Sequence, residues 1–374
     1  MRICLDLTPS IQNHAGLGRL AFETARALAA LNSGDEFSLL CVDRLKRPPR
    51  PPLDTLAQRS IPVTNKPWRL FVLMAHLSGL RLDRLLPPAD LFHATDHLLP
   101  PLKMPSVFTL ADLTFLSHAT THLPLNRWFL KLMMPRFLRQ AQAIITISEN
   151  TRRDVCRVYR VPTDKLHVIY PGVDKRFARP PTPPTQAFRE RYTLPERFIL
   201  YVGTIEPRKN LATLFEALRH AALTEIKLVI AGNKGWLHAE ILDRIKKLGL
   251  AEQVILIGFV PDEDLPSLYS LAEAFVFPSL YEGFGLPVLE AMGCGTPVIC
   301  SNTSSLPEVA GDAALLVAPT DVHGWVQVLQ QITSNSTLRT ELRHRGLAQA
   351  ARFTWETTAR QTLEVYRQTH DPSS

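Results

Sequence analysis

Short apolar segments alternate with amphipathic segments along the chain. In the first half the apolar segments lie at residues 2–7, 36–42, 91–95, 106–110, 143–148 and 166–172. Several of them are separated by helix-like stretches such as residues 19–31. Strands that alternate with helices in this way build a parallel sheet. We therefore predict an α/β domain with a doubly wound parallel sheet.

The same alternation begins again after a proline-rich interruption. Residues 179–184 read RPPTPP, and proline lacks the backbone N–H that helices and central strands need. Apolar segments follow at residues 198–204, 227–232, 254–259, 274–279, 296–301 and 313–319. The 374 residues also exceed the roughly 250–300 at which single cores stop growing. We predict Rossmann-like domains over residues 1–180 and 181–354, with a C-terminal helix and tail over 355–374 that can pack on either domain.

Two carboxylates bracket a predicted helix start in the second domain, within the sequence YEGFGLPVLE. Ligands of open parallel sheets bind where strands end and helices begin. Gly283 and Gly285 allow a ligand close to the backbone, and a helix that starts near Leu286 directs its positive end at an anion. Glu282 lies at the loop edge, whereas Glu290 is placed to accept hydrogen bonds from a ribose diol. A glycine-rich turn with an acidic residue remains the structural alternative.

A second loop carries adjacent cations, in the sequence YVGTIEPRKN. Arg208 and Lys209 follow a predicted strand and precede a predicted helix. A guanidinium fork and a compact ammonium suit a diphosphate and can neutralise the charge that develops on a departing nucleoside diphosphate. Taken alone, such a pair is more typical of an ordinary surface.

Together these motifs resemble the retaining glycosyltransferases of the GT-B fold, group 1 or family 4, whose signature is a Glu-x7-Glu pair. The resemblance extends through LVIAGNKGW, IGFVPDEDLPSLYS and SSLPEVAGDAALLV in the second half. In the first half it includes GLGRLAFETARAL and AIITISENTRRDV. It implies transfer of a sugar from a nucleotide donor with retention of configuration, without a bound metal or other cofactor.

The resemblance also implies roles for individual residues. Arg208 and Lys209 would hold the diphosphate, Glu282 and the backbone from Gly283 to Leu286 would meet the sugar and phosphate, and Glu290 would bind the ribose. A glycine loop with Gly16 and Gly18 would close over the diphosphate from the first domain. The remaining donor-side residues expected from the family are Gly203, Gly232, Lys234, Phe259, Val260 and Phe284.

One position departs from the family pattern. Many relatives have His-Asp-Leu where this chain has Ala111-Asp112-Leu113, so the sugar-contacting histidine is missing. Asp112 remains, and His93, His97 and His118 lie in neighbouring predicted loops. Spacing assigns the lost role to none of them, and we keep Asp112, His93 and His118 as acceptor-side candidates.

Charge is distributed unevenly along the chain. Residues 1–180 hold 25 Lys and Arg against 14 Asp and Glu, within a formal net charge of +7. A basic surface fits nucleic acid, anionic lipid or a phosphorylated substrate. We find no nucleic-acid reader motif and expect no nucleic-acid partner. Residues 125–139, LNRWFLKLMMPRFLR, mix apolar and basic residues, which fits either an anionic membrane surface or, more simply, a core-facing helix with a basic outer face.

Other features narrow the setting of the protein. The five cysteines lack C-x-x-C spacing, which favours reduced thiols over a disulfide or zinc framework. The first ten residues predict a strand rather than a signal peptide. Asp262-Glu263-Asp264 has D-x-D spacing, but it precedes a helix and predicts capping rather than metal binding. We expect a cytoplasmic location, with peripheral contact at the inner face of the membrane as an option.

These observations lead to one prediction of function. We expect a hexosyltransferase that takes mannose from GDP-mannose, with UDP-hexoses as alternative donors, and passes it to a saccharide acceptor such as a lipid-linked precursor of a surface polysaccharide. The alternative is a catalytically degenerate GT-B protein that binds a nucleotide sugar or a partner without turnover.

Overall fold

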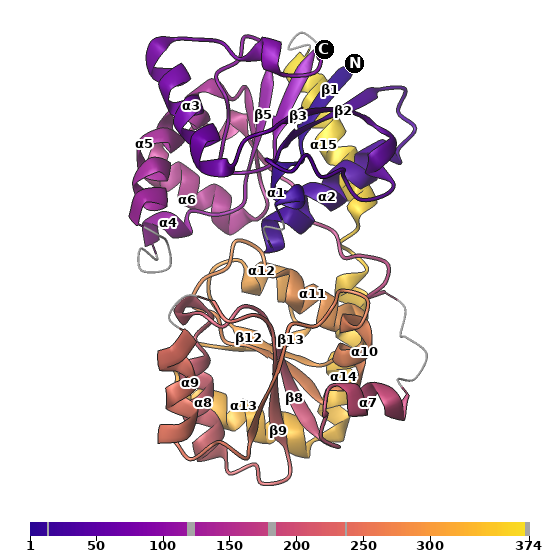
Figure 1. Ribbon diagram of the computed structural model, residues 1–374. Coiled ribbons are helices and arrows are strands. Elements are labelled where there is room, and N and C mark those ends of the chain that lie inside the picture. Colours follow the sequence, from indigo (N-terminus) through magenta and orange to yellow (C-terminus); the bar gives the residue numbers. More distant parts are fainter. Residues whose placement is uncertain (13–14, 118–123, 179–184, 236–237, 371–374) are drawn as a thin grey trace. The chain divides into compact units, whose positions relative to one another are not determined.

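The chain forms two compact units (Figure 1). The computed structural model describes residues 1–12, 15–117, 124–178, 185–235 and 238–370. The first unit combines Met1–Gly172 with Thr354–Ser374, and the second is Val173–Phe353. The units divide after Gly172, eight residues before the predicted division after residue 180, which itself falls in 179–184, outside the described residues. The first unit resumes at Thr354, so the chain returns to it for its last helix.

The first unit is built on a seven-stranded parallel sheet. Five of the six segments predicted at the start of the chain become central strands, and the sixth becomes the edge strand β7. The order across the sheet is β3 (Ala57–Ile61), β2 (Glu36–Val42), β1 (Arg2–Asp6), β4 (Leu91–Ala94), β5 (Ser106–Leu110), β6 (Ala143–Thr146) and β7 (Leu166–Val168).

Strand β3 was not predicted from the sequence. Its residues, AQRSI, include a charge and two further polar side chains and contain no apolar run. It pairs only with β2, at the edge of the sheet, and its side chains are exposed or half-buried. An edge strand keeps its place through backbone hydrogen bonds to one neighbour, so its sequence needs no apolar pattern.

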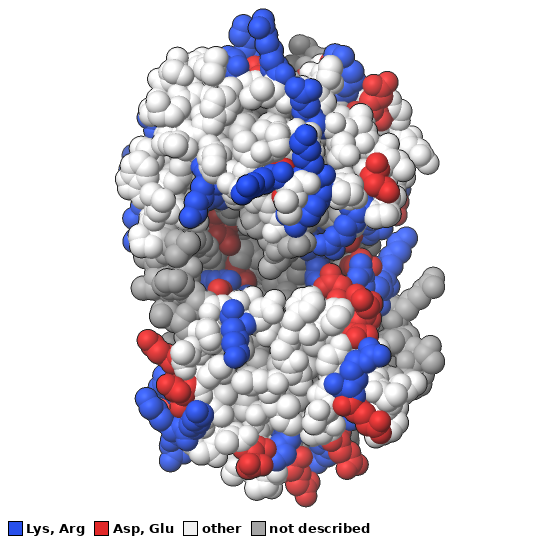
Figure 2. All heavy atoms as spheres, in the orientation of Figure 1, with Lys and Arg blue, Asp and Glu red and all other residues white. Residues whose placement is uncertain are grey.

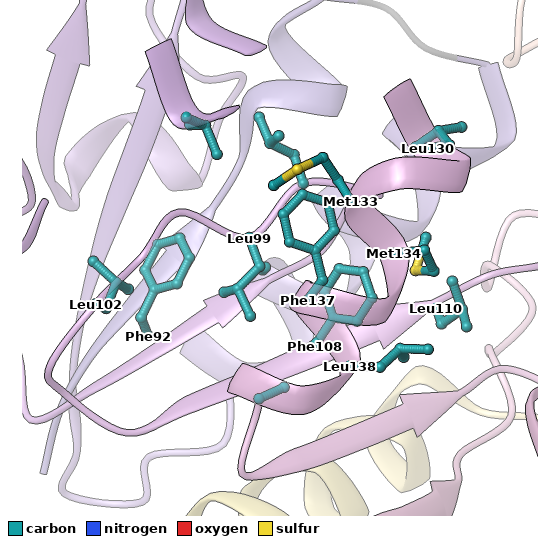
Figure 3. Close-up of a cluster of buried hydrophobic side chains, with 14 of the residues drawn as sticks. Phe92, Leu99, Leu102, Phe108, Leu110, Leu130, Met133, Met134, Phe137 and Leu138 are labelled. Atoms are coloured by element: carbon teal, nitrogen blue, oxygen red, sulfur yellow. The ribbon is translucent and has the colours of Figure 1, made fainter. Parts of the chain in front are cut away.

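Helices cover both faces of this sheet. They are α1 (Thr8–Ile11), α2 (Ala15–Ala29), α3 (Asn65–Ser78), α4 (Thr114–Ser117), α5 (Pro124–Gln140), α6 (Glu149–Tyr159) and α15 (Trp355–His370). Helix α15 packs beside α2 (Figure 1), and Leu363 and Tyr366 join the core on that face. On the other face Met133 and Phe137 of α5 pack with Phe108 of β5 (Figure 3).

The second unit has a six-stranded parallel sheet, and all six predicted segments contribute a strand. The order is β10 (Val254–Gly258), β9 (Lys227–Ala231), β8 (Phe198–Val202), β11 (Ala274–Phe277), β12 (Val298–Ser301) and β13 (Ala314–Val317). Its helices are α7 (Gln186–Arg191), α8 (Leu211–Ala221), α9 (His238–Lys247), α10 (Leu265–Leu271), α11 (Leu286–Gly293), α12 (Leu306–Ala310), α13 (Val322–Ser334) and α14 (Ser336–Ala350).

Both sheets share one topology. The strand order runs outward from β1 and β4 in the first unit and from β8 and β11 in the second. At such a switch point the loops that leave neighbouring strands diverge, and this is where doubly wound sheets bind ligands. The loops after β8 and β11 carry the two motifs selected from the sequence.

The five cysteines are free thiols, as predicted. Four are buried, and burial raises the pKa of Cys4, Cys41 and Cys300 to about 12. Thiols with such a high pKa are poorly reactive at neutral pH.

Candidate active site

The loop after β8 presents its two cations on a single turn of 3-10 helix, η5 (Pro207–Lys209). Asn210 ends this turn with φ of 57°, a left-handed conformation that asparagine tolerates better than most residues. Its amide donates to the carbonyls of Pro278 at 3.0 Å and Pro319 at 2.6 Å. Asn210 thus fastens the cation-bearing turn to the loops after β11 and β13.

Glu282, in the loop after β11, bridges both cations. Its Oε1 lies 2.7 Å from Lys209 Nζ, and its Oε2 lies 3.0 Å from Arg208 Nη1. Arg208 also donates to the carbonyl of Tyr281 at 2.6 Å and to Glu206 Oε1 at 2.7 Å. Residues 73 positions apart in the chain thereby form one largely buried ionic cluster at the switch point.

The cluster keeps Glu282 ionised. Burial alone would raise the pKa of Glu282, but the charges of Arg208 and Lys209 outweigh it and lower that pKa to about 2. Burial lowers the pKa of Lys209, and Glu282 opposes this effect. The ammonium also lies 5.0 Å from the ring centroid of Phe277, within the range of a cation–π contact.

Two serines hold the loop that carries Glu282. The backbone N–H of Glu282 donates to Ser304 Oγ at 2.9 Å. The hydroxyl of Ser305 donates to the carbonyls of Glu282 at 3.0 Å and Phe284 at 2.6 Å. Sequence reasoning assigned these serines no role, because a hydroxyl that holds a distant loop has no local signature.

Helix α11 begins at Leu286, as predicted. Gly285 is its N-cap with φ of +116°, which favours glycine, and a Cβ there would lie 2.8 Å from the Leu306 side chain. Gly283 and Phe284 complete the turn, and the ring of Phe284 packs against Phe353. The N-terminal end of α11 is therefore next to the ionic cluster in the chain.

Glu290 is almost fully buried, with 3% of its surface exposed. The hydroxyl of Tyr269 donates to its Oε2 at 3.2 Å. The carboxylate lies about one turn into α11, which begins at Leu286. Its role toward a ribose stays a prediction.

The loops after β8, β9 and β10 are tied to one another. Gly203 N–H donates to the carbonyl of Ala231, and Gly232 N–H donates to that of Gly258. A Cβ on Gly232 would lie only 2.1 Å from the Gly203 carbonyl, so this close approach requires glycine. Lys234, Phe259 and Val260 follow on these loops; the first two are exposed, and Val260 is buried.

The D-x-D segment behaves differently from its prediction. Asp264 is the N-cap residue of α10, but its side chain makes no capping hydrogen bond. It accepts hydrogen bonds from Tyr192 and Arg191 instead. Within the part of the chain that the structure describes, no group of three or more His, Cys, Asp or Glu side chains is arranged to hold a metal ion.

Comparison with known proteins identifies the family. The model of glycosyltransferase family 4 matches residues 14–177, and the model of glycosyl transferases group 1 matches residues 184–349. The O-antigen chain mannosyltransferase B of Escherichia coli is 35% identical over 284 residues, covering 74% of each chain. The chain belongs to the group 1 glycosyltransferases.

Further proteins are similar to this chain either in sequence over part of its length or in fold alone. The E. coli serotype-specific mannosyltransferase WbdA is 38% identical over 236 residues, which span 61% of this glycosyltransferase but 29% of WbdA. Sucrose-phosphate synthase from Thermosynechococcus elongatus superimposes with a TM-score of 0.77 at 21% identity, covering 98% of both chains. Anabaena Alr3699/HepE in complex with UDP-glucose has a TM-score of 0.74 at 15% identity, covering 98% of this chain and all of its own. The glycosyltransferase has the GT-B fold of these structures.

The first unit of the glycosyltransferase places two predicted glycines in a helix. Gly16 and Gly18 lie in the first turn of α2, which corrects the expected glycine loop. A Cβ on Gly18 would lie 2.8 Å from the carbonyl of Pro9. The absence of a side chain at Gly18 thus lets α2 pack closely on α1.

His93 is a core residue, contrary to its prediction as an acceptor-side group. Only 1% of its surface is exposed. One ring nitrogen lies 2.6 Å from the Tyr366 hydroxyl and the other 2.7 Å from Thr109 Oγ1. Burial lowers its pKa to about 3. With both nitrogens occupied, the ring joins α15 to the sheet and has no atom to offer a substrate.

We expect His93→Ala to destabilise the protein without weakening donor binding. The substitution leaves two buried hydroxyls without their partner, which costs about 1–3 kcal/mol each time such a group is left unsatisfied. Chemical denaturation measures the loss, and His344→Ala, at an exposed histidine, is the control. A raised KM for the donor at unchanged stability would contradict this interpretation.

Of the remaining acceptor-side candidates, Asp112 directly follows Ala111 in the chain. Asp112 Oδ1 accepts from the N–H and hydroxyl of Thr114 at 2.9 and 2.6 Å, which fixes the start of α4. His118 lies outside the described residues. Of the other histidines named from the sequence, His97 contacts Asp112: its Nε2 lies 3.2 Å from the Asp112 carbonyl and its Nδ1 3.4 Å from Asp96. Burial lowers the pKa of His97, but Asp96 outweighs it and raises that pKa.

Proposed function

We propose that this glycosyltransferase transfers a hexose, with mannose favoured, from a nucleoside diphosphate sugar to a saccharide acceptor with retention of anomeric configuration. The observation that carries the proposal is the largely buried cluster of Arg208, Lys209 and Glu282 at the switch point of the second sheet. Charge developing on a leaving diphosphate needs fixed cations, and a fixed carboxylate keeps two such cations in place before the donor arrives.

The chemistry assigns a separate task to each group. The bond between the sugar C1 and the diphosphate oxygen breaks, its electron pair stays on that oxygen, and a new bond forms between C1 and an acceptor hydroxyl oxygen. Arg208 and Lys209 stabilise the departing diphosphate, and the hydroxyl proton leaves with it or with solvent. The N-terminal end of α11 adds a partial positive charge, and Glu290 binds the ribose. None of these steps needs a metal ion or other cofactor.

The choice of mannose rests on relatives. Two E. coli relatives are named as mannosyltransferases, one of them for the O-antigen chain. We take GDP-mannose as the donor and a lipid-linked surface-polysaccharide precursor as the acceptor. UDP-hexoses are the alternative donors. An acceptor of this kind places the reaction at the cytoplasmic face of a membrane, with the enzyme bound there peripherally.

A donor screen tests the proposal. The purified protein is incubated with GDP-mannose, UDP-glucose and UDP-galactose, and both binding and slow donor hydrolysis are measured. We expect GDP-mannose to be hydrolysed fastest, and the first-formed anomer of the released sugar, followed by NMR, to match that of the donor. Inversion would overturn the retaining mechanism, and a preferred UDP-hexose would overturn mannose. Absence of binding by any donor would overturn the function.

One observation supports a second candidate. Ala111 supplies no imidazole where many relatives have a histidine, so a protein that binds nucleotide sugar without turnover is the alternative. Tight donor binding with no hydrolysis and no transfer to mannose-terminated oligosaccharides would support it.

A further inference from the structure

Helix α3 exposes an apolar face to solvent. The outward residues at 66, 67, 70, 71, 74, 77 and 78 follow helical spacing. Among them Leu70, Met74 and Leu77 are each more than half exposed, at 59%, 55% and 58%, and Phe71 is 41% exposed. The opposite side packs Trp68 and Val72 into the core. A helix that is apolar all round is normally covered on both sides.

The exposed apolar residues of the described chain are concentrated here. Seven of the thirteen large exposed ones belong to α3, the residues that follow it, and the start of α5: Leu70, Phe71, Met74, Leu77, Leu80, Leu125 and Trp128. The two helices are neighbours, because Arg69 of α3 hydrogen-bonds Asn126 and lies over the Phe129 ring of α5. We call Leu70, Phe71, Met74 and Leu77 the α3 face.

The sequence placed a membrane candidate at residues 125–139 instead. In the structure most apolar side chains of that stretch face the core, among them Leu130, Met134 and Leu138 (Figure 3). Its simpler interpretation, a core-facing helix, is therefore confirmed for all but its first turn. The exposed apolar surface lies mainly on α3.

Positive charge surrounds the α3 face. Residues 56–140 hold ten Lys and Arg, four Asp and no Glu. Lys66 on the first turn of α3, Arg81 and Arg84 just after it, and Lys131 on α5 are exposed. All four Asp are engaged in hydrogen bonds within the fold. In Figure 2 the area over α3 is nearly free of charged side chains, and those along its margin are mostly Lys and Arg.

We propose that the α3 face and its basic margin form the surface by which the protein rests on an anionic lipid bilayer. A contiguous apolar patch with a polar rim marks an interaction site. Apolar side chains enter the boundary between head groups and acyl chains, while Lys and Arg at the margin meet anionic head groups. The 14 residues of α3 extend about 21 Å and lie along the interface. Within the described residues, no helix is long and apolar enough to cross a bilayer.

A second copy of the chain fits this surface less well. In a two-fold dimer each protomer contributes the same patch, so Lys66, Arg81 and Arg84 would meet their own copies. Like charges brought together oppose such an interface. A bilayer with anionic head groups attracts the same residues.

Vesicle flotation without any sugar donor tests the proposal. We expect the protein to float with phosphatidylcholine vesicles that contain phosphatidylglycerol, and to bind less at high salt. The triple variant Leu70→Gln, Met74→Gln, Leu77→Gln should lower partitioning by roughly a hundredfold or more, because each apolar side chain contributes about tenfold when buried. Lys66→Gln with Arg84→Gln should lower it by about fivefold per charge.

A matched triple variant at exposed leucines elsewhere, Leu45→Gln, Leu256→Gln, Leu316→Gln, should bind vesicles like the parent chain. Donor hydrolysis in free solution should be the same in all variants, because the α3 face holds none of the donor-side residues. Failure of vesicle binding would therefore leave the proposed sugar transfer in place. Failure of donor hydrolysis would likewise leave the proposed membrane surface in place.

Three results would overturn the proposal: no binding of the parent chain to anionic vesicles, unchanged binding of the α3 triple variant, or equal loss in the control triple. Light scattering of the parent chain and of the α3 triple variant measures their oligomeric state. A dimer that the α3 triple variant turns into a monomer, with no vesicle binding by either form, would assign the face to self-association.

Discussion

Replacing Lys209 with alanine is expected to lower kcat of sugar transfer by about 10²–10³-fold, the usual cost of removing one donor to a developing negative charge. The ammonium is fixed between Glu282 and the ring of Phe277, so it needs no reorganisation when the donor bond breaks. Because the charge on the diphosphate grows as that bond breaks, kcat should fall more than donor affinity.

The fold should survive this change. Arg208 still neutralises Glu282 in the Lys209→Ala protein, so the melting temperature should fall by only a few degrees. Lys247→Ala, at an exposed lysine of α9, is the matched control and should leave kcat unchanged. Parent-like kcat and donor affinity in both Lys209→Ala and Arg208→Ala would show that the diphosphate binds elsewhere.

The sequence predicted every described strand except the edge strand β3. Central strands are buried on both faces, so their apolar runs are continuous and easy to find, as in residues 198–202 and 274–277. Strand β3 has no such run because only one neighbour holds it. The place of α15 also depends on a long-range contact, the hydrogen bond between Tyr366 and His93, which no local pattern encodes.

The candidate site was predictable where charged side chains directly follow predicted strands. Arg208, Lys209 and Glu282 stand directly after strands, and parallel topology brings those strand ends together. The residues that hold them were not predictable: Asn210, Ser304 and Ser305 act through hydrogen bonds to loops far away in sequence. His93 was assigned wrongly, because a buried histidine and a loop histidine look alike in a sequence.

Glu282 gives the second large effect, and its pH dependence follows from its pKa. In the folded protein this pKa is lowered from 4.5 to about 2. The ionic cluster therefore stabilises the fold fully above about pH 4.5, and this stabilisation is lost as the pH falls toward 2. Glu282→Ala leaves the largely buried cations Arg208 and Lys209 with Glu206 as the one remaining carboxylate of the cluster. Breaking a buried pair costs about 3–5 kcal/mol. Urea denaturation at pH 7 measures the loss, with Glu263→Ala, at an exposed glutamate, as control.

A double variant separates the structural part of Glu282 from its part in catalysis. Glu282→Gln combined with Lys209→Met removes both members of the ion pair, so the free energy of unfolding should return to within about 1.5 kcal/mol of the parent, since replacing a buried pair is often nearly neutral. Turnover should not return, because the diphosphate has lost a cation and the sugar a carboxylate. Because the two side chains contact each other, the losses of unfolding free energy in the two single variants should not add up to the loss in the double variant. A double-mutant cycle measures this difference directly. Recovery of both stability and kcat in the double variant would mean that Glu282 and Lys209 only neutralise each other and take no part in catalysis. Of the two cations Arg208 and Lys209, Arg208 alone would then hold the donor.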